Sequence, residues 1–176
     1  MAFCEVLLHP DGIYTARRLE LHQIPSLGGP IYVTAEACAQ WLKDNFKNLE
    51  MPATVLIEQQ MTQNYMCFAL SYTVQSYFIT QYGRGVKVIF VPADIKPLPH
   101  VLEGKQRKGA QAKNWLLDRL ATCFTKESAD ACAKVIRGSA KTDDLCDCIL
   151  QWMGYMDSLK PETKALFLAH ARSKQK

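Results

Sequence analysis

The sequence lacks the short motifs that identify several large enzyme classes. It contains no G-x-S-x-G nucleophile elbow, no G-x-x-x-x-G-K-[ST] phosphate-binding loop and no H-E-x-x-H zinc motif. Its seven cysteines form no C-x-x-C pair and no paired Cys/His spacing, so the pattern of a zinc site is missing as well. The four histidines are scattered along the chain, and such isolated histidines are more typical of a surface than of a catalytic centre.

A signal peptide and a long apolar run are also missing after Met1. A soluble intracellular protein that makes no membrane contact is therefore expected. The cysteine count is odd, and several cysteines fall on apolar helix faces. That distribution is typical of reduced cysteines in a core.

The bulk properties are those of an ordinary globular chain. A length of 176 residues and an apolar fraction of 48% predict a single domain, residues 1–176, with a sizeable core. The formal net charge is +4 and the sequence pI is about 8.6. This mild excess of positive charge is compatible with nucleic-acid binding but does not require it.

The first half of the chain alternates extended and helical patterns. Residues 3–8 and 13–21 flank the turn-forming residues 9–12, and this arrangement predicts a β-hairpin. A helix is expected over residues 34–46, with Thr34 as its N-cap. The apolar run at residues 53–57 predicts a central strand that is buried on both faces.

The strand at 53–57 leads directly into Glu58, and a long helix is expected over residues 65–82. The next strand is expected over residues 86–91, before Pro92. The order strand, helix, strand implies parallel pairing. Further helices are expected at about 110–124, 128–137, 143–159 and, as a peripheral last helix, 160–174. The predicted fold class is α/β with a mixed sheet flanked by helices.

Acidic residues gather at the start of the predicted helix at 143–159. Asp144 and Asp147 are three residues apart and share one face of a helix. One interpretation is helix capping by Thr142 or Asp143, because the helix dipole favours anions at this end. The other is a metal site that also uses Glu58, since carboxylates converging on one point would hold Mg²⁺ or Mn²⁺.

Two lysines in a small basic cluster, Lys105 and Lys108, complete the candidate residues. A bound divalent ion activates water and stabilises the leaving oxygen of a phosphodiester. A nearby lysine would offset the charge of the phosphate in the transition state. A solvated basic loop explains either lysine equally well.

Two motifs together resemble a known family. Residues 57–60 read I-E-Q-Q and are followed by Asn64 and Met66, and residues 141–151 read K-T-D-D-L-C-D-C-I-L-Q. In this order and separation they resemble the poxvirus-type branch of the RuvC-like Holliday junction resolvases. The resemblance covers about residues 2–153 and implies a ribonuclease H-like fold.

The resemblance also implies roles for individual residues. Glu58 would match the family's second catalytic acid, and Asp144 and Asp147 would match the paired acids of its last catalytic helix. Lys108 would match the catalytic lysine, with Lys105 as the alternative, and Asp143 would be auxiliary. Family members are homodimers that bind four-way DNA junctions and nick two strands with Mg²⁺ in each site.

One departure concerns the family's first strand, which carries an aspartate in a pattern like D-x-G-x-K-N, followed by A-x-C. Ala2-Phe3-Cys4 matches that A-x-C, so the first strand and its acid are missing from the sequence. A register that places the motif on Asp11-Gly12 is disfavoured, because these residues suit the hairpin turn. An upstream extension that supplies the strand is therefore expected.

Three functions remain open on the sequence alone. The first is a metal-dependent endonuclease that nicks four-way DNA junctions during recombination or replication. The second is a catalytically impaired relative that only binds branched DNA or scaffolds a partner. The third is another ribonuclease H-like nuclease, acting on RNA or on RNA–DNA hybrids.

Overall fold

The computed structural model describes residues 1–23, 29–50, 52, 54–96, 110–140 and 142–173. The described residues fall into two compact units. One unit combines Met1–His22 with Ile95–Lys176, and the other is Gln23–Asp94. We call them the hairpin unit and the parallel-strand unit. The expectation of a single domain over residues 1–176 stays a prediction.

The hairpin unit begins with the two antiparallel strands that the sequence predicts, β1 (Ala2–Leu8) and β2 (Tyr14–Leu21). The turn between them depends on Asp11 and Gly12. The Asp11 side chain accepts a hydrogen bond of 2.9 Å from the backbone N–H of Ile13, and Gly12 has a φ of +87°. Such a φ is strained for residues with a Cβ atom, so glycine suits this position.

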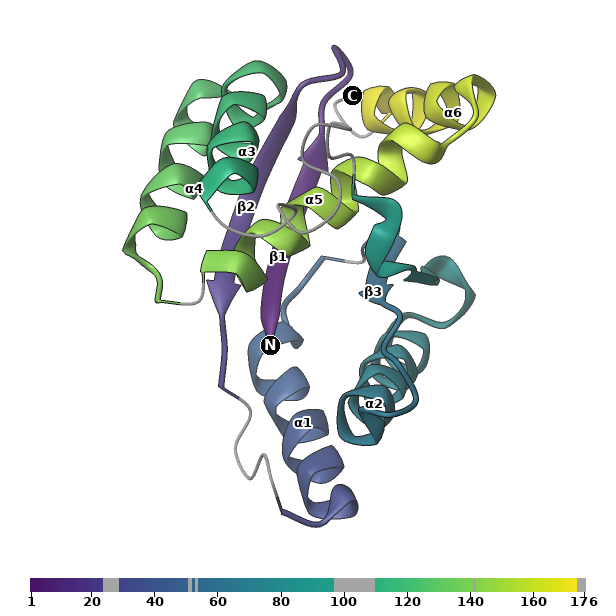
Figure 1. Cartoon of the computed structure of the whole chain (residues 1–176). Coiled ribbons are helices and arrows are strands. Elements are labelled where there is room, and N and C mark those ends of the chain that lie inside the picture. The colour runs from purple at the N-terminus through teal and green to yellow at the C-terminus, as the bar shows by residue number, and fades with distance from the viewer. Residues whose placement is uncertain (24–28, 51, 53, 97–109, 141, 174–176) are drawn as a thin grey trace. The chain divides into compact units, whose positions relative to one another are not determined.

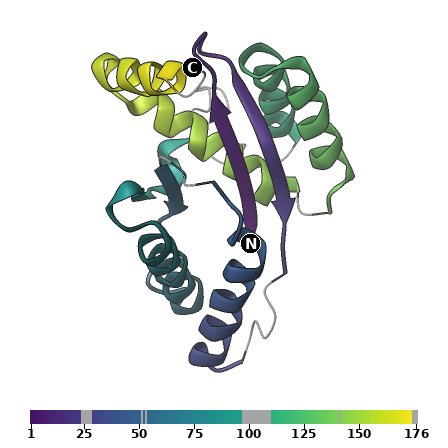
Figure 2. The ribbon, with the colours of Figure 1, turned by 180° about the vertical axis from the view of Figure 1, so that it is seen from behind.

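Four helices complete the hairpin unit, and all four expected helices are confirmed to within a few residues. They are α3 (Ala110–Cys123), α4 (Lys126–Gly138), α5 (Thr142–Ser158) and α6 (Pro161–Ser173). Helix α5 passes across the hairpin and contacts both strands, and α4 packs on β2 (Figure 1). Figure 2 shows the hairpin from the opposite side, in front of α5.

The core of the hairpin unit is one cluster of apolar side chains. Period-two alternation turns Ala2, Cys4 and Val6 of β1 toward this cluster. The fully buried members from the helices recur at helical spacing, as expected for amphipathic helices that bury one face. The buried members are Leu19, Leu116, Leu120, Phe124, Ala129, Cys132, Ile136, Leu145, Cys146, Ile149, Leu150 and Met153.

A buried serine fixes α4 against the edge of the hairpin. The Ser128 hydroxyl accepts a hydrogen bond of 2.7 Å from the backbone N–H of Ala16 and donates one of 3.3 Å to the Ala16 carbonyl. A bulge next to this residue, where Arg17 is the extra residue on β2, interrupts the regular ladder. The serine therefore satisfies backbone groups of β2 that would otherwise be unpaired.

The parallel-strand unit has the predicted strand–helix–strand order. Strand β3 (Thr54–Glu58) pairs in parallel with β4 (Lys87–Val91), and α2 (Tyr65–Tyr82) connects them. Helix α1 (Ile31–Phe46) packs on α2. Gly83, at a φ of +60°, ends α2 at the predicted residue. Two short 3₁₀ turns follow, η1 (Gly83–Gly85) and η2 (Ala93–Ile95).

Two details of the parallel-strand unit differ from expectation. Thr34 is not the N-cap of α1, because the helix starts at Ile31; Thr34 is buried in the first turn and donates to the Pro30 carbonyl at 3.3 Å. Pro30 precedes the helix, and its fixed φ favours this early start. Strand β3 is not buried on both faces, since only Ile57 is buried and the other four residues are half-buried.

The sheet arrangement confirms the α/β class and leaves the finer prediction open. Both parallel and antiparallel pairings occur, but in the described residues they form two separate two-stranded sheets rather than one mixed sheet. No described strand pairs with the second edge of β1 or of β3. The ribonuclease H-like sheet therefore stays a prediction.

Within the described part of the chain, none of the helices is both long and apolar enough to cross a membrane.

Candidate active site

The candidate site is centred on the N-terminal turns of α5. Leu145, Ile149 and Leu150 are buried in the core of the hairpin unit, and they fix the orientation of the helix. Asp143 and Asp144 lie in its first turn and are exposed. Because the N-terminal end of a helix carries partial positive charge, both carboxylates are stabilised there without further partners.

Asp147 lies on the same face as Asp144, as the spacing predicts. Its carboxylate Oδ2 is 2.6 Å from the Nζ of Lys96. The Lys96 side chain is 14% exposed and that of Asp147 is 41% exposed. A pair at this distance, with one member mostly shielded from water, is a charge-assisted hydrogen bond rather than a loose surface contact.

Gly154 explains how Lys96 reaches α5. The chain at Ile95 lies against the helix at this glycine, and a Cβ atom there would overlap the Ile95 carbonyl oxygen and come within 2.7 Å of its carbon. Gly154 lies seven residues after Asp147, two turns further along α5. The missing side chain lets the backbone before Lys96 cross the helix closely.

Cys146 is the buried neighbour of the acidic residues. Burial raises the pKa of its thiol to about 11, with smaller contributions from Asp143 and Asp147 and an opposing one from Lys113. The thiol is therefore protonated at neutral pH and is a poor nucleophile or metal ligand. Among the described residues, the charged groups noted at this end of α5 are the three carboxylates and the ammonium groups of Lys96 and Lys113.

Glu58 belongs to the other unit. It is the last residue of β3, opposite Val91 of β4, and is half-buried. The next backbone N–H, of Gln59, donates to the Val91 carbonyl at 2.7 Å and continues the ladder past the strand. The expected position at the carboxyl end of a parallel strand, where ligands bind in open α/β sheets, is confirmed.

The predicted lysines, Lys105 and Lys108, lie outside the described residues. Lys96 is the lysine that the structure adds, and sequence reasoning missed it. It comes directly after η2, in a proline-rich connection without a motif. The one local signal for a functional role is its position after the carboxyl end of β4, the strand that pairs in parallel with β3.

The donor chemistry of α5 fits a hard divalent cation, because Asp144 and Asp147 offer carboxylate oxygens on one face. Within the described ranges, however, no three His, Cys, Asp or Glu side chains form a group that could hold a metal ion. Lys96 supplies the positive charge beside Asp147. A divalent ion at Asp147 would therefore compete with the ammonium group of Lys96.

Comparisons with protein-family models, with curated proteins and with solved structures found no match for this chain.

Proposed function

We propose that the chain is a metal-dependent endonuclease of the RuvC-like resolvase type that nicks four-way DNA junctions. The observation that carries the proposal is the face of α5 shared by Asp144 and Asp147, with Lys96 against Asp147. Glu58 at the carboxyl end of β3 supports it, because the acids then stand on the elements that the resemblance implies. A ribonuclease H-like arrangement of the strands is part of the same proposal.

In this proposal Glu58, Asp144 and Asp147 would hold Mg²⁺, for which Mn²⁺ could substitute. Such an ion would supply an activated water and charge stabilisation for the leaving oxygen of the phosphodiester. Lys96 neutralises Asp147, and its ammonium group is a cation that would pair with a DNA phosphate bound beside the acids. Lys108, or Lys105 in the alternative assignment, offsets further charge on the phosphate.

Homodimer formation belongs to the proposal because a junction presents two symmetric strands for cleavage. Helix α2 offers a surface for it: Tyr65, Tyr72 and Ile79 are 62%, 46% and 48% exposed and recur every seven residues. Residues at this spacing form one stripe along a helix, the pattern by which helices pair. Sedimentation analysis of wild type and Tyr72→Lys tests it, and a monomeric wild type would contradict it.

The test of the activity is a nicking assay on a synthetic four-way junction with Mg²⁺, beside a linear duplex of the same sequence. We expect paired nicks in the junction and little cleavage of the duplex. Asp144→Asn and Asp147→Asn should lower the rate at least 100-fold while junction affinity changes less than threefold. Asp118→Asn, an exposed acid on α3, is the matched control. Wild-type protein that binds the junction without nicking it, in Mg²⁺ and in Mn²⁺, would contradict the proposal.

A second candidate is a protein that binds branched DNA without cutting it. The Lys96–Asp147 pair favours this reading, because it neutralises one carboxylate without any metal. Binding in EDTA that equals binding in Mg²⁺, with a steep salt dependence and no nicks, would support it. Failure to bind junctions at 50 mM salt would contradict both candidates.

A further inference from the structure

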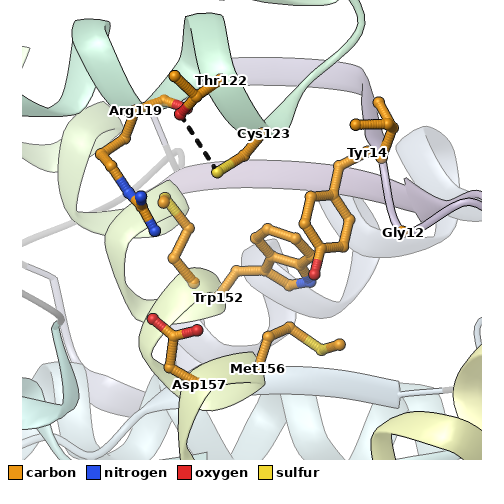
Figure 3. A pocket seen from close by; sticks show the side chains of 10 residues that line it. Gly12, Tyr14, Arg119, Thr122, Cys123, Trp152, Met156 and Asp157 are labelled. Atoms are coloured by element: carbon orange, nitrogen blue, oxygen red, sulfur yellow. Dashed lines mark hydrogen bonds between the residues drawn. The ribbon is translucent and has the colours of Figure 1, made fainter.

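A pocket of about 260 Å³ opens in the hairpin unit, apart from the acidic face of α5. Its walls come from the hairpin turn, the end of α3 and the second half of α5 (Figure 3). The volume lies just below the ~300–1,000 Å³ common for small-molecule sites, so there is room for one ring system. The lining residues are Gly12, Ile13, Tyr14, Arg119, Thr122, Cys123, Trp152, Met153, Met156 and Asp157.

The inner wall of the pocket is aromatic. The rings of Tyr14 and Trp152 meet edge to face with centroids 4.2 Å apart, and Phe124 supports both at 5.7 and 5.8 Å. Met153 and Met156 are buried beside them. Ordered aromatic rings and polarisable thioethers form a good surface for a planar aromatic group.

The rim of the pocket carries one charge of each sign. Arg119 and Asp157 are exposed, and their side chains extend toward each other from α3 and α5 (Figure 3). The guanidinium carbon of Arg119 lies 5.9 Å from the centroid of the Trp115 ring, which restrains the arginine. Lys164 approaches the Asp157 carboxylate only to 3.9 Å, a distance that leaves the carboxylate able to accept hydrogen bonds from a ligand.

We propose that this pocket binds a single unstacked nucleotide of DNA, with its base against Trp152, base N–H groups donating to Asp157 and its phosphate on Arg119. A planar ring with N–H donors on one edge and an anion on the other side matches the aromatic wall and both rim charges at once. A purely apolar ligand would make no use of Arg119 and Asp157, and an anion alone would leave the aromatic wall unused. The ligand class depends on the proposed DNA substrate, and the site lets the protein hold a base that is splayed out of a junction.

The test uses deoxynucleoside 5′-monophosphates and the full chain. Titration of dGMP and dAMP is followed by the indole N–H signal of Trp152 in two-dimensional NMR, assigned from the spectrum of Trp152→Phe. We expect saturable shifts with a Kd of about 1 mM or below. Arg119→Gln and Asp157→Asn should each weaken binding at least fivefold. The matched controls are Arg137→Gln and Asp130→Asn, two exposed residues of α4, and they should leave the Kd unchanged.

Two further probes separate the nucleotide from simpler ligands. Inorganic phosphate and deoxyguanosine, each alone, should bind at least fivefold more weakly than dGMP. The proposal would be overturned if the Trp152 signal did not shift at 10 mM of either nucleotide. It would also be overturned if Arg119→Gln and Asp157→Asn bound the nucleotides as tightly as wild type does. Tighter binding of a tryptophan-containing peptide than of dGMP would also overturn it, in favour of a protein partner.

The nucleotide titration and the nicking assay can fail independently of each other. If junctions are nicked but dGMP does not bind, the pocket assignment alone fails. If dGMP binds at Trp152 but junctions are neither bound nor nicked, the nuclease proposal alone fails. If junctions are nicked and dGMP also binds at Trp152, Arg119→Gln should weaken junction binding while leaving duplex binding unchanged.

Discussion

Lys96 Nζ and Asp147 Oδ2 are 2.6 Å apart, across two elements that are distant in the sequence. The contact is possible because Gly154 lets the chain at Ile95 lie directly on α5. One carboxylate of the predicted acid pair therefore has a built-in counter-ion, and the other, Asp144, faces solvent.

Lys96→Met should raise the affinity of the site for Mn²⁺. The ion would no longer have to displace an ammonium group from Asp147, and we expect a three- to tenfold lower Kd by isothermal titration calorimetry. The free energy of unfolding should fall by only about 1 kcal/mol, because Asp147 stays solvated when the lysine is removed. Lys134→Met, at an exposed position on α4, is the control. A weaker affinity for Mn²⁺ in Lys96→Met would show that the lysine supports the ion instead.

Gly154→Ala should destabilise the hairpin unit. The new methyl group would overlap the Ile95 carbonyl, and overpacking of this kind costs about 1–3 kcal/mol. Urea unfolding of wild type and variant measures the difference. Gly138→Ala is the matched control, because a Cβ atom there has no neighbour within 4 Å. Equal stability of wild type and Gly154→Ala would contradict the close crossing at α5.

Ser128→Ala should cost about 1–3 kcal/mol of unfolding free energy. It leaves the backbone N–H of Ala16 without the hydroxyl that now accepts its hydrogen bond in a part-buried position. Ser158→Ala removes a hydroxyl that donates to the Tyr155 carbonyl. Ser158 is an exposed residue whereas Ser128 is only 6% exposed, so this change should cost less than half as much. Thermal unfolding of the two variants side by side measures both losses of stability. Equal losses would contradict the role of Ser128 at the hairpin edge.

Stability should decrease at acid pH partly through Glu20. The Arg18 guanidinium, with two hydrogen bonds of 2.9 and 2.8 Å, holds the pKa of Glu20 below its ordinary value of 4.5, and His22 adds to the effect. The unfolded chain then binds the proton more tightly, so this contribution is present above about pH 4.5 and is lost as pH falls through the lowered pKa. NMR titration of the Glu20 carboxyl should give a value below 4.5 that rises in Arg18→Gln. An unchanged value in that variant would exclude the arginine as the cause.

Much of the fold could be predicted because local signals agreed with burial. Asp11 and Gly12 have the chemistry of a hairpin turn, and α2 runs over the residues that its apolar spacing and Gly83 indicate. The start of α1 was missed because Thr34 has the residue type of an N-cap, whereas tertiary packing buries it inside the first turn. The pairing within the hairpin and the parallel pairing of β3 with β4 were predicted. The single mixed sheet could not be derived, because it depends on pairing between strands that are distant in the sequence.

The site was predictable only in its local part. Asp144 and Asp147 share a helix face because of their spacing, and Glu58 ends β3 because the apolar run stops there. Lys96 could not be found, because its partner is on a different element and no motif surrounds it. The pocket with Trp152 and Tyr14 was missed for the same reason, since its walls come from the hairpin and two helices.

A cation site at Asp144 and Asp147 is the claim on which the proposed function depends, and Mn²⁺ tests it most directly. Paramagnetic Mn²⁺ broadens NMR signals near its binding site, so a titration at substoichiometric Mn²⁺ reports which residues hold the ion. We predict that the amide signals of Asp144 and Asp147 broaden first in wild type. In Asp144→Asn, the amide signals of residues 144 and 147 should stay sharp at the same Mn²⁺ concentration. Broadening centred elsewhere, or none at these residues with 1 mM Mn²⁺, would contradict it.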